Sequence, residues 1–387
     1  MGLVPALTEI TKIGFEMTVE TLVQERYAEG AQQRQESLCC PVDYDTALLK
    51  ILPQEIIDKD YGCGDPSRYA REGDTVLDLG SGGGKICYMA AQIVGAEGAV
   101  IGVDMTDDML ALARSYQPEM AAKLGGDRVS FHKGYIQDLA LDVHAMEVWL
   151  QHHPVNDGSS LQALNQWQSE QRSQAPMIAD SSVDLVISNC VLNLVAEHDR
   201  RQMLEGIFRV LKPGGRVAIS DIVCDEDVPQ HLKDDATLWS GCISGAFHEL
   251  GFAQAFIDAG FVAVEYDKWD EQPWQVVEGI EFRSVTLCAV KPDHQNLVDA
   301  GQAVVYRGPF SETRDDLGNL YRRGERIAVS RRTFDLLSQA PYAEHFILMQ
   351  PDTAVDIGCF SLPAGTVRSA AETKGGSHGG ASSSSCC

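Results

Sequence analysis

Residues 75–84 read TVLDLGSGGG, an apolar run that passes through an aspartate into a glycine-rich loop. The apolar run predicts a short buried strand, and residues 85–93 (KICYMAAQI) predict a helix directly after the loop. Glycines there let the backbone turn tightly and approach a ligand, while the amino terminus of the helix offers N–H groups to it. Asp104 ends the next apolar run, residues 99–104 (AVIGVD), where a carboxylate can accept both hydroxyls of a ribose. This order predicts a nucleotide-binding βαβ unit.

The alternation of strand and helix continues along the chain. Further strands are expected at residues 129–134, 183–189 and 215–221, and further helices at residues 109–123 and 201–211. Strands that alternate with helices form parallel βαβ units, so the predicted fold class is α/β with a doubly wound sheet. The later runs are expected to finish the sheet as a hairpin-like pair of strands, at residues 261–269 and 282–291.

Composition shifts divide the chain into five segments. The first is a helical region, residues 1–60, with helices expected at residues 14–34 and 44–57. The second, residues 61–221, holds the nucleotide-binding pattern and an inserted Gln-, His- and Ser-rich stretch, residues 140–180, expected to be flexible with some helix. Residues 222–292 complete the sheet. The last segments are a small α+β domain, residues 293–362, with strand-like runs at residues 303–306 and 326–330, and a disordered Gly- and Ser-rich tail, residues 363–387.

Composition and charge disfavour several classes of function. With 44% hydrophobic and 22% charged residues, the 387-residue chain is typical of a globular protein with two or three domains. The net charge of −25 predicts no nucleic-acid partner, because phosphate backbones are bound mainly by Lys and Arg. No apolar run reaches the roughly 20 residues of a membrane span, and no signal peptide is evident, so no membrane partner is expected. Eleven cysteines in such a chain predict reduced thiols and a cytoplasmic location.

Two further features bear on which cofactor this unit binds. A dinucleotide-binding dehydrogenase is one alternative, but Asp78 precedes the first glycine and residues 211–216 (LKPGGR) precede the fifth strand. Both features resemble class I S-adenosylmethionine-dependent methyltransferases. That resemblance implies a Rossmann-like, seven-stranded sheet whose last strand is antiparallel. The cofactor-binding residues that it implies are Asp78, Gly80, Ser81, Gly82, Gly84, Asp104, Met105, Ile136, Gln137 and Asn189.

A cysteine stands where the methyl acceptor is expected. Cys190 closes the fourth apolar run, residues 183–190 (VDLVISNC), and ligands of an open parallel sheet bind beyond the carboxyl ends of its strands. The Asn-Pro-Pro-aromatic motif of amino-methylating nucleic-acid enzymes is absent from this place. Thiolates bind soft centres such as trivalent arsenic. Such an acceptor keeps a lone pair and has no proton to lose, so its methylation needs no general base.

Several motifs resemble the arsenite S-adenosylmethionine methyltransferase family: VQERY (23–27), YGCG (61–64), SNCVLNL (188–194), SGCISGA (240–246) and FRSVT (282–286). The resemblance implies that Cys63, Cys190 and Cys242 bind As(III), supplied as a thiol adduct, and that residues 222–292 are an arsenic-binding segment. It also implies that Cys39 or Cys40 forms a disulfide with Cys63 during turnover, which glutathione or thioredoxin then reduces. The products that it implies are mono- and dimethylated arsenicals, in arsenic detoxification.

Other functions stay open from the residues alone. A C- or O-methyltransferase of a small apolar metabolite, such as a quinone or sterol precursor, predicts activity that is insensitive to cysteine substitution. A non-catalytic, thiol-based protein that sequesters arsenic or a metal predicts arsenite binding without cofactor binding. Cys87, Cys288 and Cys359 are expected to be structural, and the motifs assign no role to Cys224 or to Cys386-Cys387 in the tail. The chain is expected to be a monomer.

Overall fold

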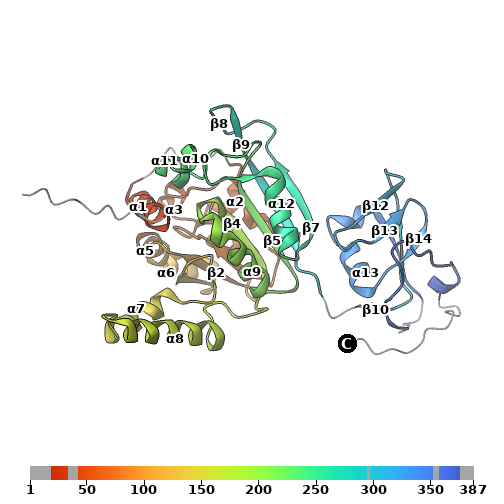
Figure 1. The fold of residues 1–387 in the computed structure, drawn as a ribbon, viewed down its shortest axis with the longest axis horizontal. Coiled ribbons are helices and arrows are strands. Elements are labelled where there is room, and N and C mark those ends of the chain that lie inside the picture. The colour runs from red at the N-terminus through yellow and green to blue at the C-terminus, as the bar shows by residue number, and fades with distance from the viewer. Residues whose placement is uncertain (1–18, 34–41, 294–296, 352–356, 375–387) are drawn as a thin grey trace, which may run out of the picture.

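A large twisted sheet forms the centre of the molecule (Figure 1). The computed structural model of the chain describes residues 19–33, 42–293, 297–351 and 357–374. In these ranges the sheet has the order β3-β2-β1-β4-β5-β9-β7, with β6 paired to β5 and β8 to β9. The strands are β1 (Thr75–Leu79), β2 (Ala99–Asp104), β3 (Val129–Lys133), β4 (Val183–Asn189), β5 (Leu211–Cys224), β6 (Phe247–His248), β7 (Val262–Trp269), β8 (Gln275–Val277) and β9 (Ile280–Val290).

The directions of the strands confirm the predicted doubly wound sheet. Strands β1 to β5 pair in parallel, whereas β9, the last in the sequence, runs antiparallel to both β5 and β7. The short strands β6 and β8 add to the predicted set of seven in the described part of the chain. The order reverses direction beside β1, and this switch point is where open α/β sheets bind their ligands.

Helices pack on both faces of the sheet (Figure 1). They are α1 (Val19–Gln32), α2 (Thr46–Leu49), α3 (Gln54–Asp58), α4 (Lys85–Ile93), α5 (Asp107–Ser115), α6 (Gln117–Leu124), α9 (Arg200–Val210), α10 (Gln230–Lys233), α11 (Ala236–Ser240) and α12 (Glu249–Asp258), with the 3-10 turns η2 (Pro66–Tyr69), η3 (Leu192–Leu194) and η4 (Glu197–Asp199). Helix α9 illustrates the cause, because Met203, Ile207 and Val210 are buried at helical spacing while its other face is polar.

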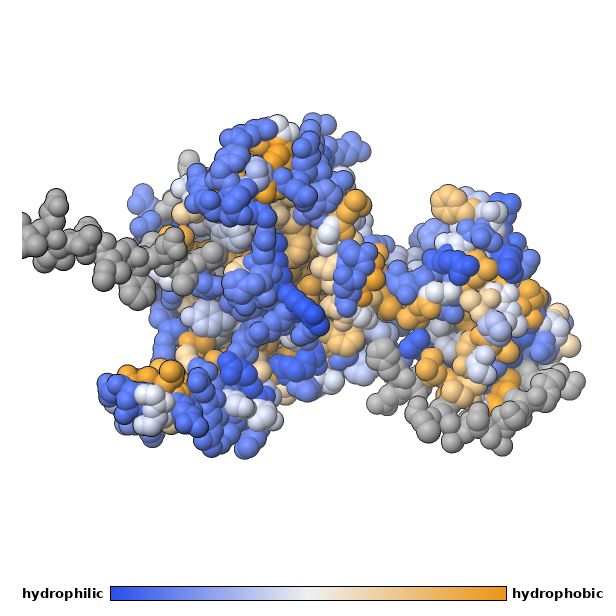
Figure 2. Space-filling view, in the orientation of Figure 1, coloured by the Kyte–Doolittle hydropathy of each residue, from blue (hydrophilic) through white to orange (hydrophobic). Residues whose placement is uncertain are grey.

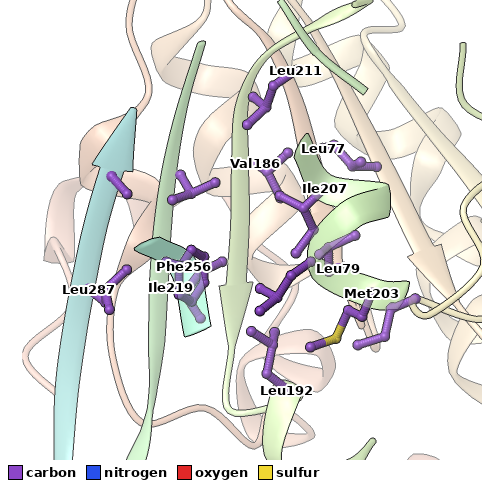
Figure 3. Packing of buried hydrophobic residues seen from close by; sticks show 14 of the residues in the cluster. Leu77, Leu79, Val186, Leu192, Met203, Ile207, Leu211, Ile219, Phe256 and Leu287 are labelled. Carbon is purple, nitrogen blue, oxygen red and sulfur yellow. The ribbon is translucent and has the colours of Figure 1, made fainter. Parts of the chain in front are cut away.

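The main core lies between the sheet and the helices α9 and α12 (Figure 3). Leu77, Val186 and Ile219 project from β1, β4 and β5 toward Ile207 of α9 and Phe256 of α12. All five side chains are buried. Burying a side chain of this size contributes roughly 1.5–3 kcal/mol. Because β1 and β4 are buried on both faces, they read in the sequence as nearly continuous apolar runs.

Two predicted helices are each broken by a proline. The helix expected over residues 44–57 is α2 and α3, separated at Pro53, and the helix expected over residues 109–123 is α5 and α6, separated just before Pro118. Proline lacks an N–H and crowds the turn before it, so it is disfavoured inside a helix. Pro53 is the N-cap of α3, and Pro118 lies in the first turn of α6, where a missing N–H costs little. The prediction of single helices was wrong in both places.

The insertion at residues 140–180 is more regular than predicted. It contains α7 (Val143–His152) and α8 (Gly158–Gln174), which extend from the sheet as a helical hairpin (Figure 1). Trp149 and Trp167 stack across the hairpin with ring centroids 5.6 Å apart. An ion pair of 2.9 Å between Arg172 and Asp138 ties α8 to the sheet domain. Apolar side chains, Leu161 among them, stay exposed on the hairpin, and Figure 2 shows orange surface there.

Residues after 297 form a small unit with its own core at one end of the molecule (Figure 1). Val304, Tyr321, Ile327, Leu337 and Phe346 are buried together in it. Its elements are β10 (Val298–Asp299), β11 (Ala303–Tyr306), β12 (Glu312–Arg314), β13 (Leu320–Arg322), β14 (Arg326–Ala328), α13 (Arg331–Leu337), η5 (Tyr342–Glu344), β15 (Phe346–Met349), β16 (Gly358–Cys359) and η6 (Glu372–Lys374).

Residues 363–374 belong to the small unit and not to the predicted disordered tail. Disorder was expected from residue 363, but residues 363–374 pack on the small unit. Arg368 is buried there and its guanidinium lies 2.9 Å from the Asp299 carboxylate, while the Ala328 N–H donates to the Thr366 carbonyl at 2.8 Å. The expectation is therefore wrong for these residues, because a buried ion pair holds them. Cys386-Cys387 lies outside the described residues.

Among the helices of the described ranges, none combines the length and apolarity needed to cross a membrane.

One cysteine of the small unit is oxidised. Cys359 is disulfide-bonded, so the expectation that all cysteines are reduced is wrong for this residue.

Candidate active site

A cleft opens at the carboxyl ends of β1, β2 and β4. The cleft is partly open to solvent, and the glycine-rich loop and the acid at the end of β2 lie in its lining. Helix α1 contributes Val23 and Tyr27 to one wall. The predicted cofactor residues that line the cleft are Asp78, Gly80, Ser81, Gly82, Asp104, Met105, Ile136, Gln137 and Asn189. Gly84 is not in the lining, because it caps the amino terminus of α4.

The glycine-rich loop needs its glycines for two different reasons. Gly80 and Gly82 adopt φ values of 69° and 50°, in the left-handed region that side chains disfavour. A Cβ at Gly80 would lie 2.5 Å from a methyl of Val191, so the loop also packs closely against the turn after β4. A Cβ at Gly82 would meet nothing within 4 Å, which shows that this backbone faces open space in the cleft. The loop is therefore shaped to leave room for a ligand.

Asp104 and Ser81 present polar atoms to that space. The buried Asp104 carboxylate accepts the Gly82 N–H at 2.9 Å and the Thr106 N–H at 2.8 Å. Burial raises the pKa of Asp104, and these backbone donors oppose the rise. Ser81 Oγ is buried and, among the residues that the structure describes, has no hydrogen-bond partner. An orphaned hydroxyl beside a carboxylate fits a ligand rich in hydroxyl and amino groups, as S-adenosylmethionine is.

Asp78 and Asn189 line the cleft but are engaged by the protein. The Cys87 thiol donates to Asp78 at 3.2 Å, and burial raises the pKa of Asp78 to about 7. The Asn189 side chain binds the segment that contains Cys63: its Oδ1 accepts the N–H groups of Cys63 and Gly64 at 2.9 and 3.0 Å, and its Nδ2 donates to the Gly64 carbonyl at 2.9 Å. Asn189 therefore holds the Cys63 loop against the end of β4.

The segment YGCG packs so tightly that both of its glycines are required. A Cβ at Gly62 would lie 1.9 Å from Asn189 Nδ2, and a Cβ at Gly64 would lie 2.3 Å from Ser220 Oγ. On the other side the Ser284 hydroxyl donates to the Cys63 carbonyl at 2.7 Å. Cys63 is fully buried as a result. The motif residues around Cys63 thus act together to fix one thiol.

Cys190 and Cys242 meet from opposite sides of the site. The Cys190 N–H donates to the Ser220 carbonyl at 2.7 Å, just past the end of β4. Cys242 follows α11, and its thiol donates to the Cys190 carbonyl at 3.0 Å. Both residues have left-handed backbone, with φ values of 63° and 61°. A non-glycine residue in this region is uncommon and costs about 1–3 kcal/mol, so the surroundings must hold it there.

Two of the three predicted thiols, those of Cys63 and Cys190, converge on one buried volume, and the Cys242 sulfur is not part of that closest group. The sulfurs of Cys63 and Cys190 and a carboxylate oxygen of Asp221 all lie within 4.8 Å of one another. Cys242 belongs to the same buried apolar cluster as Cys63 and Cys190. Cys224 is buried in that cluster too, but its thiol donates to the Phe247 carbonyl at 3.4 Å, and burial raises its pKa to about 12. Cys39 and Cys40 lie outside the described residues.

Sequence reasoning missed two residues of the site. Asp221 ends the fifth predicted strand, and its carboxylate lies beside the Cys63 and Cys190 sulfurs. No motif in the sequence indicated that this residue belongs to the site. Burial raises its pKa to about 6, and the N–H groups of Ile222, Asn193 and Leu192 oppose the rise. Tyr27, quoted above only within a motif, shares a hydrogen bond with Cys242. Burial raises the pKa of this phenol, and Cys242 and Cys190 raise it further, so Tyr27 stays protonated against the thiols.

The sheet order, the glycine-rich loop and the acid at the end of β2 define a class I methyltransferase. A methyltransferase domain matches residues 70–166 and 164–275, and a domain of unknown function (DUF8838) matches residues 293–378. The chain belongs to the arsenite methyltransferase family. It is 32% identical over 350 residues to the arsenite methyltransferase of Aquipseudomonas alcaligenes, a match that covers 84% of this chain and 89% of that protein.

Two further relatives agree. The arsenite methyltransferase of Mus musculus is 30% identical over 347 residues, covering 86% of this chain and 80% of that protein. The crystal structure of an arsenic(III) S-adenosylmethionine methyltransferase from Chlamydomonas reinhardtii superposes with a TM-score of 0.54 at 29% identity. That match covers 83% of this chain and 100% of the other.

Proposed function

We propose that the chain transfers the methyl group of S-adenosylmethionine to trivalent arsenic bound by Cys63, Cys190 and Cys242. One observation carries the proposal: the Cys63 and Cys190 sulfurs lie within 4.8 Å of each other, and the Cys242 thiol donates a hydrogen bond to the Cys190 carbonyl. Cys190 also lines the cleft that holds the glycine-rich loop. An arsenic atom on these sulfurs would face the cofactor.

Each residue of the site then has a task. Arsenite arrives as a thiol adduct, and each cysteine thiol displaces one thiol of the adduct, which leaves with the proton. When bound, S-adenosylmethionine supplies an electrophilic methyl group, and the arsenic lone pair forms the new As–C bond while the electrons of the broken S–CH₃ bond stay on the departing sulfur. Asp104 and Ser81 orient the cofactor. Apolar side chains such as Val191 and Leu194 exclude water from the reacting atoms.

The redox balance requires thiols as reductants. Methyl transfer leaves arsenic formally pentavalent, and two cysteine thiolates can return two electrons to it by forming a disulfide. We assign this disulfide to Cys63 with Cys39 or Cys40, by resemblance to the family. Glutathione or thioredoxin would reopen it by thiol exchange, which favours the cytoplasm as the compartment. A monomer is sufficient for this scheme, because one chain supplies every residue that it uses.

The proposal also assigns tasks to the segments of the chain. Residues 61–221 bind the cofactor, and residues 222–292 carry Cys242 and complete the sheet. Helix α1 of the first segment closes the arsenic side of the cleft with Tyr27, whose neighbour Arg26 donates to the Thr237 carbonyl at 2.6 Å on α11. The inserted hairpin and residues 293–362 touch neither the thiols nor the cofactor cleft in the described residues.

A product assay tests the proposal. The purified protein, arsenite, a thiol reductant and methyl-labelled S-adenosylmethionine should give labelled mono- and dimethylated arsenicals. Cys190→Ser and Cys242→Ser should each lower the rate by at least about 100-fold, because a hydroxyl does not replace a thiolate as a ligand for a soft centre. Cys288→Ser is the matched control, since Cys288 lies on β9 outside the thiol cluster. Retention of most of the arsenic methylation rate in either active-site variant would remove that cysteine from the mechanism. Absence of labelled arsenicals with the wild-type protein would instead favour a C- or O-methyltransferase.

A further inference from the structure

Buried polar groups connect the turn after Cys190 with the loop after Cys242. Asn193 is fully buried, and its Nδ2 donates to Asp221 at 2.7 Å and to the Ile222 carbonyl at 2.6 Å. Its Oδ1 accepts the Phe247 N–H at 3.3 Å. One side chain in the Cys190 turn therefore binds both the end of β5 and the residue that begins β6.

Arg200 makes a second connection between the same segments. Its guanidinium donates to the Val195 carbonyl at 3.1 Å and to the Asn193 carbonyl at 3.4 Å on one side, and to the Gly245 carbonyl at 2.6 Å on the other. The guanidinium also lies 4.2 Å from the centre of the Phe247 ring. No carboxylate of the described residues forms an ion pair with it, although the side chain is only 9% exposed. A buried cation is thus held mainly by main-chain carbonyls of the two segments.

The two segments also touch directly at Gly245. A Cβ at this position would lie 2.2 Å from the Asn193 carbonyl oxygen, so only glycine allows the backbones to approach this far. Trp239 adds a donor from its indole nitrogen to the Leu194 carbonyl at 3.4 Å. The loop that carries Cys242 is therefore seated on the turn that follows Cys190, three residues from each thiol.

We propose that Asn193, Arg200 and Gly245 are positioning residues that set the distance between the Cys190 and Cys242 thiols, so that both bind one arsenic atom. The inference rests on the proposed function and extends it. Both cysteines have left-handed backbone, a conformation that persists only where the surroundings over-determine it. The contacts of Asn193, Arg200 and Gly245 join these two turns, and none of the three residues lines the cofactor cleft.

The first test replaces the bridging guanidinium while keeping its charge. Lysine has no planar fork with which to reach Val195, Asn193 and Gly245 together. Arg200→Lys should therefore raise the dissociation constant for arsenite by about tenfold or more, because hydrogen bonds from a charged donor are lost. Calorimetry with S-adenosylhomocysteine should give an unchanged affinity. Arg201→Lys is the matched control, since Arg201 is exposed and pairs only with Glu205 in the described structure.

A second variant separates the loops without changing a charge. Gly245→Ala forces the Cys242 loop away from the Asn193 carbonyl, and should weaken arsenite binding by a comparable factor. Gly251→Ala is its control, because a Cβ there meets its nearest neighbour, His248, at an ordinary 3.9 Å. In Arg200→Lys and in Gly245→Ala, the near-ultraviolet absorption of arsenic–thiolate bonds should lose intensity at saturating arsenite, whereas the two control variants should keep it.

The outcomes separate this inference from the proposed function. If the wild-type protein does not bind arsenite, the proposed function fails. If the wild type binds it and Arg200→Lys and Gly245→Ala bind it equally well, the positioning role is wrong while the proposed function stands. Equal losses of arsenite and S-adenosylhomocysteine affinity would also overturn the positioning role, because they would mark a general structural defect.

Discussion

Several residues at or near the thiols have an unfavourable backbone conformation or an unusual protonation state. These features reduce the stability of the fold, and they are expected where a site requires them. Cys190 and Cys242 are left-handed, and Tyr27 keeps its proton beside them. Asp78 and Asp221 are buried carboxylates whose pKa values burial raises to about 7 and about 6. Such groups lower the stability of the folded chain where they are ionised, and buried carboxylates beside a ligand cleft or a thiol cluster are typical of a functional site.

The pH dependence of stability tests the assignment for Asp78. Its folded pKa of about 7 exceeds the ordinary value of 3.8, so the folded state binds this proton more tightly than the unfolded state does. The contribution of Asp78 is therefore most favourable below about pH 4 and is lost as the pH rises toward 7. Thermal melts of Asp78→Asn should show a gain over the wild type that grows between pH 5 and pH 8. A gain that is the same at every pH would show that Asp78 ionises normally.

At the scale of elements, the strands were predictable and the breaks between helices were not. Strands β1, β2 and β4 are buried on both faces, so each reads as an apolar run that ends in a recognisable motif. The breaks at Pro53 and before Pro118 carry a local signal that the periodicity of the longer helices concealed. The hairpin α7–α8 lacks buried residues along α8, and so its polar sequence read as a flexible segment.

A capping variant tests whether α8 is an autonomous element. Asp157 accepts the Ser160 N–H at 2.8 Å, within a capping box, and these bonds lower the pKa of Asp157 to about 2. Asp157→Ala removes the acceptor, so amides in the first turn of α8 should exchange with deuterium several-fold faster. The melting temperature and the arsenic methylation rate should stay at wild-type values. A fall in the methylation rate would mean that the hairpin acts on the active site.

The candidate site was predictable only in part, for a physical reason. The three cysteines and the glycine-rich loop each lie in a short motif, and each motif can be recognised from a few consecutive residues without knowledge of the fold. The network spans 28 residues between Asn193 and Asp221 and 45 residues between Arg200 and Gly245, and its members are common residue types with no local pattern. Only the packing of η3 against β5 and α11 brings them together. The proposed disulfide of Cys63 with Cys39 or Cys40 stays a prediction.

For the whole molecule, the described structure contains a cofactor-binding sheet domain and a small unit after residue 297 with a separate core. The contact between them includes Tyr342, whose hydroxyl receives a hydrogen bond from the Ala263 N–H of β7 and lies near Glu265. Burial and the nearby carboxylates raise the pKa of Tyr342. Because each unit has its own core, we expect each to lose its structure separately.

Calorimetric unfolding of Arg368→Met tests this separation. The substitution leaves the Asp299 carboxylate buried without its cation, which typically costs about 3–5 kcal/mol. The transition of the small unit should move to lower temperature, while the transition of the sheet domain and the affinity for S-adenosylhomocysteine stay unchanged. A single transition that shifts as a whole would show that the two units unfold together.

X-ray absorption at the arsenic edge tests the central claim most directly. With one equivalent of arsenite bound, the wild-type protein should show arsenic surrounded by sulfur alone, from Cys63, Cys190 and Cys242. Cys242→Ser should replace part of that sulfur shell with oxygen, and Cys288→Ser should leave it unchanged. A first shell dominated by oxygen in the wild type, or one indifferent to Cys242→Ser, would contradict the account.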